Sequence, residues 1–228
     1  MSSGILYVIG SPIGNLGDLS HRAVEVLLSI DLIASEDTRV TSILLKKYSI
    51  NKKCISYHDK NENSKFQKII NFLESGSNVA LISDAGTPCL SDPGYRVVNA
   101  ARKNNIEVVS IPGASSITAA LSISGLPSDH FYFEGFLPKK KGRKTKLEFL
   151  SSMDCSIVIF ESPHRIIRTL NDILQYFGNR AISICREITK IYEENYFGYI
   201  DEVLNKMESG TIKGEFVLIV SKKGYSID

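Results

Sequence analysis

The stretch that decides the fold reads Val79-Ala80-Leu81-Ile82-Ser83-Asp84-Ala85-Gly86-Thr87-Pro88. Its first four residues are apolar, as in a strand that is buried on both faces. It ends in an acid, a glycine and a proline, where a chain turns sharply. Open α/β sheets bind ligands just beyond the carboxyl ends of their strands, so Asp84 would lie at the mouth of a site and Gly86 would let a ligand approach the backbone. An ordinary tight turn between a strand and a helix explains the same residues.

Strand-like and helix-like segments alternate around this stretch throughout the first half of the chain. The strand-like runs are residues 5–9, 32–34, 79–82 and 106–111. Such alternation predicts a mostly parallel sheet flanked by helices. In the second half, strand-like runs follow one another without long helices between them, which favours a mixed sheet with helices.

Residues 125–130, Gly-Leu-Pro-Ser-Asp-His, break the alternation and form the candidate linker. The expected organisation is therefore an N-terminal α/β domain over residues 1–124 and a C-terminal α/β domain over residues 125–228.

Composition limits the classes of function. The chain has 228 residues, 43% of them hydrophobic, and a net charge of only +2, so any nucleic-acid binding must come from a local patch. We expect no membrane span and no signal peptide. Four cysteines without C-x-x-C spacing argue against a zinc site and a disulfide framework, and they fit a reducing, cytoplasmic location.

The loop that follows the first strand, residues 10–18, holds three glycines and a proline. It is able to offer backbone N–H groups to a ligand. It lacks the G-x-G-x-x-G order of a dinucleotide site and the G-K-[ST] of a phosphate loop, so phosphate binding is only weakly indicated.

The densest basic run of the chain follows an aromatic strand-like segment, residues 131–136. Its cations are Lys139, Lys140, Lys141, Arg143, Lys144 and Lys146. Aromatic residues beside clustered cations suit an RNA contact. A solvated loop is the competing interpretation, because most charge runs are exposed to solvent without a partner.

Six motifs occur together and in order along nearly the whole chain. They are Gly10-Ser11-Pro12-Ile13-Gly14-Asn15-Leu16, Ser35-Glu36-Asp37-Thr38-Arg39, Ser83-Asp84-Ala85-Gly86-Thr87-Pro88, Glu134-Gly135-Phe136-Leu137-Pro138, Glu161-Ser162-Pro163-His164-Arg165 and Lys213-Gly214-Glu215. Each is weak alone, but the set resembles the bacterial ribosomal small-subunit (16S) RNA cytidine 2′-O-methyltransferases of the tetrapyrrole (class III) methylase superfamily. The Pro112-Gly113-Ala114-Ser115 loop departs from the family, which often has a second proline there.

The resemblance implies two α/β domains with S-adenosylmethionine between them, no metal, a homodimer, and a substrate in the small ribosomal subunit. The neutral loops at Gly86 and Gly113 suit a donor without a phosphate, and its cationic sulfonium suits a carboxylate at a strand mouth. The residues expected to bind the donor are Pro12, Asp84, Ala85, Gly86, Pro88, Gly113, Ala114, Ser115, Gly214 and Glu215.

Methyl transfer to a ribose hydroxyl requires alignment of the hydroxyl and removal of its proton. The candidates for this chemistry are Glu36, Asp37 and Arg39, with Lys190 from the second domain. Ion pairs that join the domains are the structural alternative for these residues. Two other functions stay open: a methylase acting on a small tetrapyrrole, which the basic run disfavours, and a non-catalytic RNA-binding assembly factor, which the Asp84–Pro88 loop disfavours.

Overall fold

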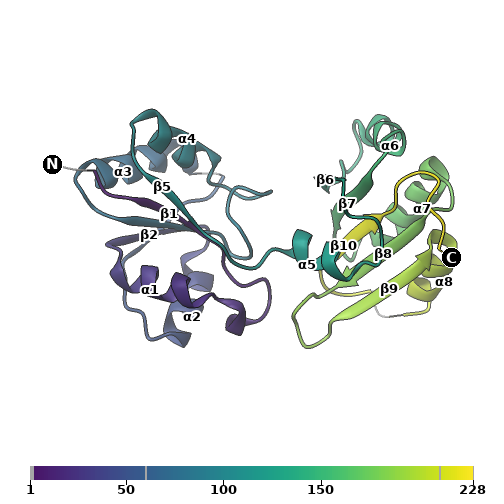
Figure 1. The fold of residues 1–228 in the computed structure, drawn as a ribbon, viewed down its shortest axis with the longest axis horizontal. Helices are drawn as coiled ribbons and strands as arrows, with labels where there is room; N and C mark the ends of the chain where they lie inside the picture. Colours follow the sequence, from purple (N-terminus) through teal and green to yellow (C-terminus); the bar gives the residue numbers. More distant parts are fainter. Residues whose placement is uncertain (1–2, 60, 211, 228) are drawn as a thin grey trace. The chain divides into compact units, whose positions relative to one another are not determined.

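The computed structural model describes residues 3–59, 61–210 and 212–227. The chain divides into two compact units, residues 1–115 and 116–228, each with its own sheet (Figure 1). The division precedes helix α5 (Ser116–Ile123), whereas the boundary predicted at residues 124 and 125 lies at the other end of that helix. The domain boundary between residues 124 and 125 therefore stays a prediction.

Unit 1 is built on a five-stranded parallel sheet in the order β3-β2-β4-β1-β5. Its strands are β1 (Leu6–Ile9), β2 (Leu32–Ser35), β3 (Cys54–Ser56), β4 (Val79–Ile82) and β5 (Val108–Ile111). All four residues of β4 are at most 2% exposed, as expected for a strand covered on both faces. The predicted parallel α/β architecture of this half is confirmed.

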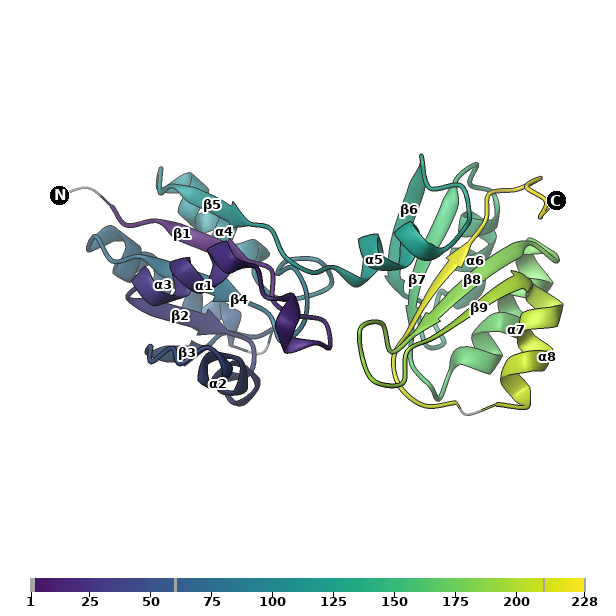
Figure 2. The same cartoon turned by 60° about the horizontal axis from the view of Figure 1, so that its bottom comes forward.

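Helices cover both faces of this sheet. They are α1 (His21–Ser29), α2 (Thr38–Lys47), α3 (Glu62–Glu74) and α4 (Tyr95–Lys103), with a short 3₁₀ helix η1 (Leu16–Asp18). One core lies between the sheet and α1 and α2, and includes Leu27 and Leu44. The other lies between the sheet and α3 and α4, and includes Ile70 and Val97. Both layers can be followed in Figures 1 and 2.

Unit 2 has a mixed five-stranded sheet in the order β6-β7-β10-β8-β9. Its strands are β6 (Phe131–Phe136), β7 (Ser156–Glu161), β8 (Ala181–Arg186), β9 (Glu194–Tyr199) and β10 (Phe216–Val220). Strands β6 and β7 pair in parallel, whereas β7 with β10, β10 with β8, and β8 with β9 pair antiparallel. The predicted mixed sheet is confirmed.

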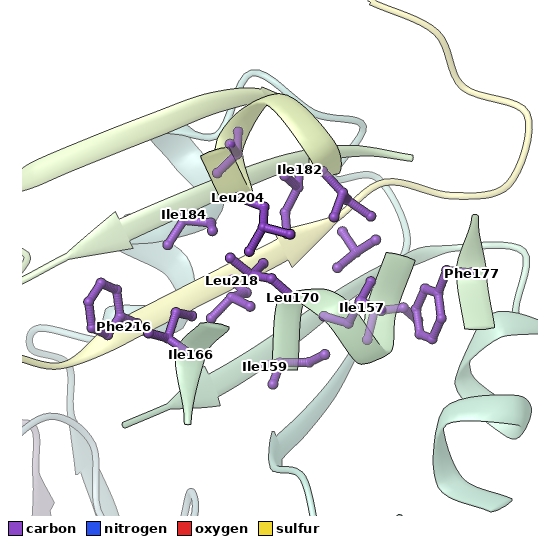
Figure 3. Packing of buried hydrophobic residues seen from close by; sticks show 14 of the residues in the cluster. Ile157, Ile159, Ile166, Leu170, Phe177, Ile182, Ile184, Leu204, Phe216 and Leu218 are labelled. Atoms are coloured by element: carbon purple, nitrogen blue, oxygen red, sulfur yellow. The ribbon is translucent and has the colours of Figure 1, made fainter. Parts of the chain in front are cut away.

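Three helices pack on one face of this second sheet: α6 (Arg143–Ser151), α7 (Ile166–Phe177) and α8 (Ile200–Glu208). Figure 3 shows side chains of α7 and α8 interdigitating with those of β7, β8 and β10, with Leu170 and Leu218 among them. Helix α5 packs against β10 from the other face (Figure 2). In the part of the chain that the structure describes, no helix is both long and apolar enough to span a membrane.

Candidate active site

The loops that follow the five strands of unit 1 meet at one edge of the sheet, because parallel strands share the direction of their carboxyl ends. The loops after β1 and β4 are held together by paired backbone hydrogen bonds, from Ser11 N to Gly86 O at 2.9 Å and from Gly86 N to Ser11 O at 3.2 Å. The Ser11 hydroxyl is buried and donates to Ser83 O at 3.0 Å. Gly86 has a φ of +79°, a conformation that glycine adopts without a steric penalty.

The loops after β1 and β5 touch through two glycines. A Cβ atom on Gly113 would lie 2.3 Å from the carbonyl oxygen of Gly10. Gly113 is therefore needed for packing of one loop on the other, in addition to any role toward a ligand. At Gly86, by contrast, the nearest atom to an added Cβ is 3.4 Å away, on Ile13, so space is available there.

The loops after β2 and β4 exchange carboxylate contacts. Asp84 Oδ1 accepts a hydrogen bond from Asp37 N at 2.9 Å. Glu36 Oε2 in turn accepts a long hydrogen bond from Asp84 N at 3.5 Å. Asp37 also caps helix α2, because its side chain accepts from Arg39 N at 2.8 Å. Glu36, Asp37 and Asp84 therefore lie together, and their hydrogen bonds fasten neighbouring loops to each other.

The acids at this edge differ in their affinity for protons. Burial, followed by the nearby charge of Asp84, raises the pKa of Glu36. Burial and then the charge of Glu36 raise the pKa of Asp92 to about 6. Hydrogen bonds from the exposed Arg39 guanidinium lower the pKa of Asp37 to about 2. The edge thus holds one strongly acidic carboxyl and two that retain a proton more readily.

Asp92 was not among the residues predicted for the site. It lies in the loop between β4 and α4, where Cys89 and Ser91 have positive φ values of 73° and 62°. Left-handed residues that are not glycine are uncommon, and they gather where the surrounding structure imposes them. In the sequence, the feature that could have pointed to Asp92 is the Ser91-Asp92-Pro93-Gly94 turn, which comes just after residues 79–88. Within the described residues, no group of three or more His, Cys, Asp and Glu side chains is arranged to hold a metal ion.

Eight of the ten residues predicted to bind the donor lie on the neighbouring loops after β1, β4 and β5. They are Pro12, Asp84, Ala85, Gly86, Pro88, Gly113, Ala114 and Ser115. Their side chains range from buried Pro12 and Pro88 to exposed Ala85. The other two, Gly214 and Glu215, belong to unit 2.

In unit 2, Gly214 and Glu215 pack against the loop between β8 and β9. A Cβ atom on Gly214, whose φ is +90°, would lie 2.4 Å from Cγ of Glu187. Lys190 Nζ contacts Glu187 Oε1 at 2.8 Å and Glu215 Oε2 at 3.0 Å. Burial opposes its charge, but the hydrogen bonds to Glu187 and Glu215 outweigh burial and raise the pKa of Lys190. Lys190 is thus a protonated cation that fastens two loops.

The six cations of the basic run are not equivalent. Lys139, Lys140, Lys141 and Lys144 are exposed, and Lys146 pairs with Glu134 at 3.3 Å. The Arg143 side chain is only 5% exposed. It contacts Asp172 at 2.7 Å, Thr169 Oγ1 at 2.8 Å and Pro138 O at 3.1 Å. Arg143 therefore holds the loop and α7 together, and the exposed cations of the basic run are all lysines.

Comparison with known proteins identifies the family. Residues 5–204 match the family described as Tetrapyrrole (Corrin/Porphyrin) Methylases. Among curated proteins, "Ribosomal RNA small subunit methyltransferase I" of Halalkalibacterium halodurans is 46% identical, with 99% of this chain aligned to 78% of that protein. The protein of the same name from Thermotoga maritima is 42% identical, over 96% of this chain and 99% of its own length.

Solved structures share the fold at low sequence identity. The methyltransferase CobJ superposes with a TM-score of 0.71 at 17% identity, covering 99% of this chain and 98% of its own. Cobalt precorrin-4 methyltransferase gives 0.70 at 14% identity, with 95% and 94% covered. With the match over residues 5–204 and relatives above 40% identity, this chain belongs to the tetrapyrrole (corrin/porphyrin) methylase family.

Proposed function

We propose that this protein transfers the methyl group of S-adenosylmethionine to the 2′-hydroxyl of a cytidine in the 16S RNA of the small ribosomal subunit. The observation that carries the proposal is the 42–46% identity, over nearly all of the chain, to proteins named ribosomal RNA small subunit methyltransferase I. We further propose that it works in the cytoplasm, as a homodimer and on the small subunit.

The residues at the carboxyl edge of unit 1 fit this methyl donor. S-adenosylmethionine carries positive charge on its sulfonium and its amino group, and no phosphate. The edge offers acids, Asp84 and Glu36, together with a glycine turn at Gly86, beside which there is space for an added Cβ atom. When bound, the donor supplies an electrophilic methyl carbon. The protein's own residues have to hold the donor and align the ribose hydroxyl in line with that carbon.

Removal of the hydroxyl proton falls to a residue of the acidic edge. Asp37 is a poor proton acceptor, because Arg39 holds its pKa at about 2. Glu36 is the better acceptor, because its pKa is raised. We assign Asp37 and Arg39 to orienting the target nucleotide. We assign Lys190 to contact the target nucleotide through its positive charge, because its ion pairs with Glu187 and Glu215 keep it protonated.

The lysines of unit 2 supply the contact with RNA phosphates. Lys139, Lys140 and Lys141 precede the N-terminus of α6, and Lys144 lies in its first turn. The N-cap is Gly142, which has no side chain to accept a hydrogen bond from the first N–H groups of the helix. A helix N-terminus carries partial positive charge and favours anions, so cations there are stabilised by a bound phosphate.

Methyl transfer to small subunits tests the proposal. The protein is mixed with radiolabelled S-adenosylmethionine and small subunits from a strain that lacks the modification. We expect label to enter the RNA at a 2′-O-methylcytidine. Labelling of a uroporphyrinogen-type acceptor instead would favour a tetrapyrrole methylase. RNA binding without donor binding in calorimetry would favour an assembly factor. A second assay with naked RNA as the acceptor shows whether the substrate is the assembled subunit or free RNA.

A further inference from the structure

A row of phenylalanines lies on the face of the second sheet that helices α6, α7 and α8 leave uncovered. Ile157 and Ile159 of β7 point into the helical core, so the alternate residues Val158 and Phe160 point to the other face. The pairing register places Phe131, Phe133 and Phe136 of β6 beside Ser156, Val158 and Phe160 in turn. All three phenylalanines therefore share the face of Phe160.

A bulge in β6 makes this row possible. Phe133 and Phe136 are three residues apart, so a regular strand would direct them to opposite faces. The register shifts between Phe133 and Gly135, and Gly135 has a φ of +71°. A bulge of this kind re-aims the side chains that follow it. Glu134, the residue within the bulge, turns to the helical side and pairs with Lys146.

Phe136 is exposed and yet held in place. It is 57% exposed, the largest exposure among the phenylalanines of β6 and β7. Its ring centroid lies 5.8 Å from that of Phe160 in an edge-to-face contact, and Phe160 makes a second such contact with Phe133 at 5.0 Å. More than half of Phe136 is thus open to a partner, while the contact with Phe160 holds its ring in place.

The chain that leaves Phe136 leads directly to the lysines. Leu137 O accepts from Arg165 at 2.6 Å, and Pro138 O accepts from the buried Arg143 at 3.1 Å. These bonds fix the connection between the exposed ring and the exposed cations Lys139, Lys140 and Lys141. An aromatic face beside tethered cations is the combination that binds single-stranded nucleic acid, with a stacked base and neighbouring phosphates.

We infer that Phe136, supported by Phe160, stacks on an unpaired base of the RNA substrate while Lys139, Lys140 and Lys141 hold the adjoining phosphates. The inference rests on the proposed function and adds the stacking residue. RNA is favoured over a second copy of this chain by charge. A two-fold interface would be built from the same patch of each copy, so it would gather the lysines of both copies in one contact.

Two substitutions at one position separate stacking from simple apolar contact. Phe136→Leu keeps an apolar side chain and removes the ring, whereas Phe136→Trp keeps an aromatic face. The probes are unmodified small subunits and a single-stranded RNA with 2-aminopurine at the target base. We expect Phe136→Leu to weaken RNA binding about tenfold to a hundredfold, the usual range for losing one stacked base. Phe136→Trp is expected to keep RNA binding at the wild-type level and to quench 2-aminopurine fluorescence as the wild type does.

The salt dependence supplies a second readout. Stacking releases no counterions, so Phe136→Leu should leave the slope of log K against log salt unchanged, whereas Lys140→Gln should lower it by about one. Phe197→Leu is the matched control, because Phe197 is 44% exposed on β9 at the other edge of the same sheet. This control should bind RNA as the wild type does.

Three outcomes would overturn the inference: wild-type affinity for Phe136→Leu, a change in salt slope with this variant, or a change in its mass by sedimentation. The last would assign the row to contact between two copies of the chain. Donor affinity and melting temperature check that the variants fold. If the wild type itself neither binds nor methylates small subunits, the proposed function fails. If the wild type does both and Phe136→Leu binds equally well, the stacking inference alone fails.

Discussion

The carboxyl edge of the first sheet and the end of β6 in the second sheet are both places where parallel strands run into loops, yet their chemistry is opposite. In unit 1 the charged groups are acids that bind neighbouring loops, as Asp84 does with the backbone of Asp37. In unit 2 the charged groups are lysines, and Lys139, Lys140 and Lys141 extend into solvent from a loop fixed by buried Arg143. The chain thus keeps a site suited to a small cation apart in sequence from a surface suited to a polyanion.

The two regions also differ in how strongly their like charges repel one another. Burial, followed by repulsion from neighbouring carboxylates, raises the pKa values of Glu36 and Asp92, so a cation that binds at the acidic edge would relieve this repulsion. The exposed lysines repel one another much less, because solvent screens their charges. Their net contribution to the stability of the fold is therefore small. Substitutions at the acidic edge should therefore change loop geometry and donor binding, and substitutions among the lysines should change RNA affinity alone.

The largest expected effect comes from Gly113→Ala. The added Cβ would lie 2.3 Å from Gly10 O, so the loops after β1 and β5 must separate. We expect donor affinity to fall by more than about a hundredfold, together with a lower melting temperature of unit 1. Titration calorimetry with S-adenosylmethionine measures the first, and calorimetric melting measures the second.

Gly86→Val sharpens this test, because its Cβ position is open and its φ of +79° is the main obstacle. A positive φ in a residue with a side chain costs roughly 1–2 kcal/mol. We expect Gly86→Val to lose donor binding while the fold is retained. Donor affinity equal to wild type in this variant would remove Gly86 from the donor site.

The next effect concerns proton removal by Glu36. Positioned general bases contribute about 10²–10⁴-fold in rate. We expect Glu36→Gln to slow single-turnover methyl transfer by at least about a hundredfold at saturating donor and RNA. In the wild type, the rate should rise with pH through the raised pKa of Glu36 and then level off. A comparable loss of rate in Asp37→Asn, with an unchanged pH profile, would indicate an orienting role for Asp37.

A smaller effect should separate the lysines from Arg143. Replacing Lys139, Lys140 and Lys141 by Gln should weaken RNA binding and lower the salt slope by about one for each RNA phosphate that a lysine no longer holds. The melting temperature should stay the same. Arg143→Ala should instead lower the melting temperature and keep the salt slope, because it removes the buried guanidinium that contacts Asp172, Thr169 and Pro138. Asp172 would keep its longer contact with the exposed Arg168, at 3.8 Å. If the triple variant keeps its salt slope, the lysines are simply solvated.

The contrast between these cations also marks what the sequence could predict. The apolar run of β4 and the alternation of strands and helices predicted the parallel sheet, because burial on both faces needs an uninterrupted apolar segment. The basic run gave no sign that Arg143 differs from its neighbours. Its partners Thr169 and Asp172 lie more than 25 residues further along the chain, and only the packing of α7 brings them near. Likewise, the raised pKa of Asp92 depends on burial in the folded chain and then on the charge of Glu36 from another loop.

The smallest expected effect is a pH dependence of the free energy of unfolding that arises from titration of Asp92. Its pKa is raised to about 6 in the folded protein by burial and by the charge of Glu36, with Asp84 and Asp59 adding to the repulsion. In the unfolded chain the pKa of an aspartate is about 3.9. Between these values the folded state binds more protons than the unfolded state, so Asp92 contributes stability at low pH that is lost as the pH rises through about 6.

Asp92→Asn removes the charge that burial and Glu36 oppose. Allowing for its partial exposure to solvent, we expect the variant to be more stable than the wild type by about 1 kcal/mol at pH 7.5, or roughly 2–4 °C in melting temperature. At pH 4 the two proteins should melt alike, because the wild-type carboxyl is then protonated. Asp154→Asn, the same substitution on an exposed turn of unit 2, is the control and should show no such difference. A variant that is less stable at pH 7.5 would mean that the Asp92 carboxylate holds its loop through contacts that outweigh the repulsion of the acidic edge.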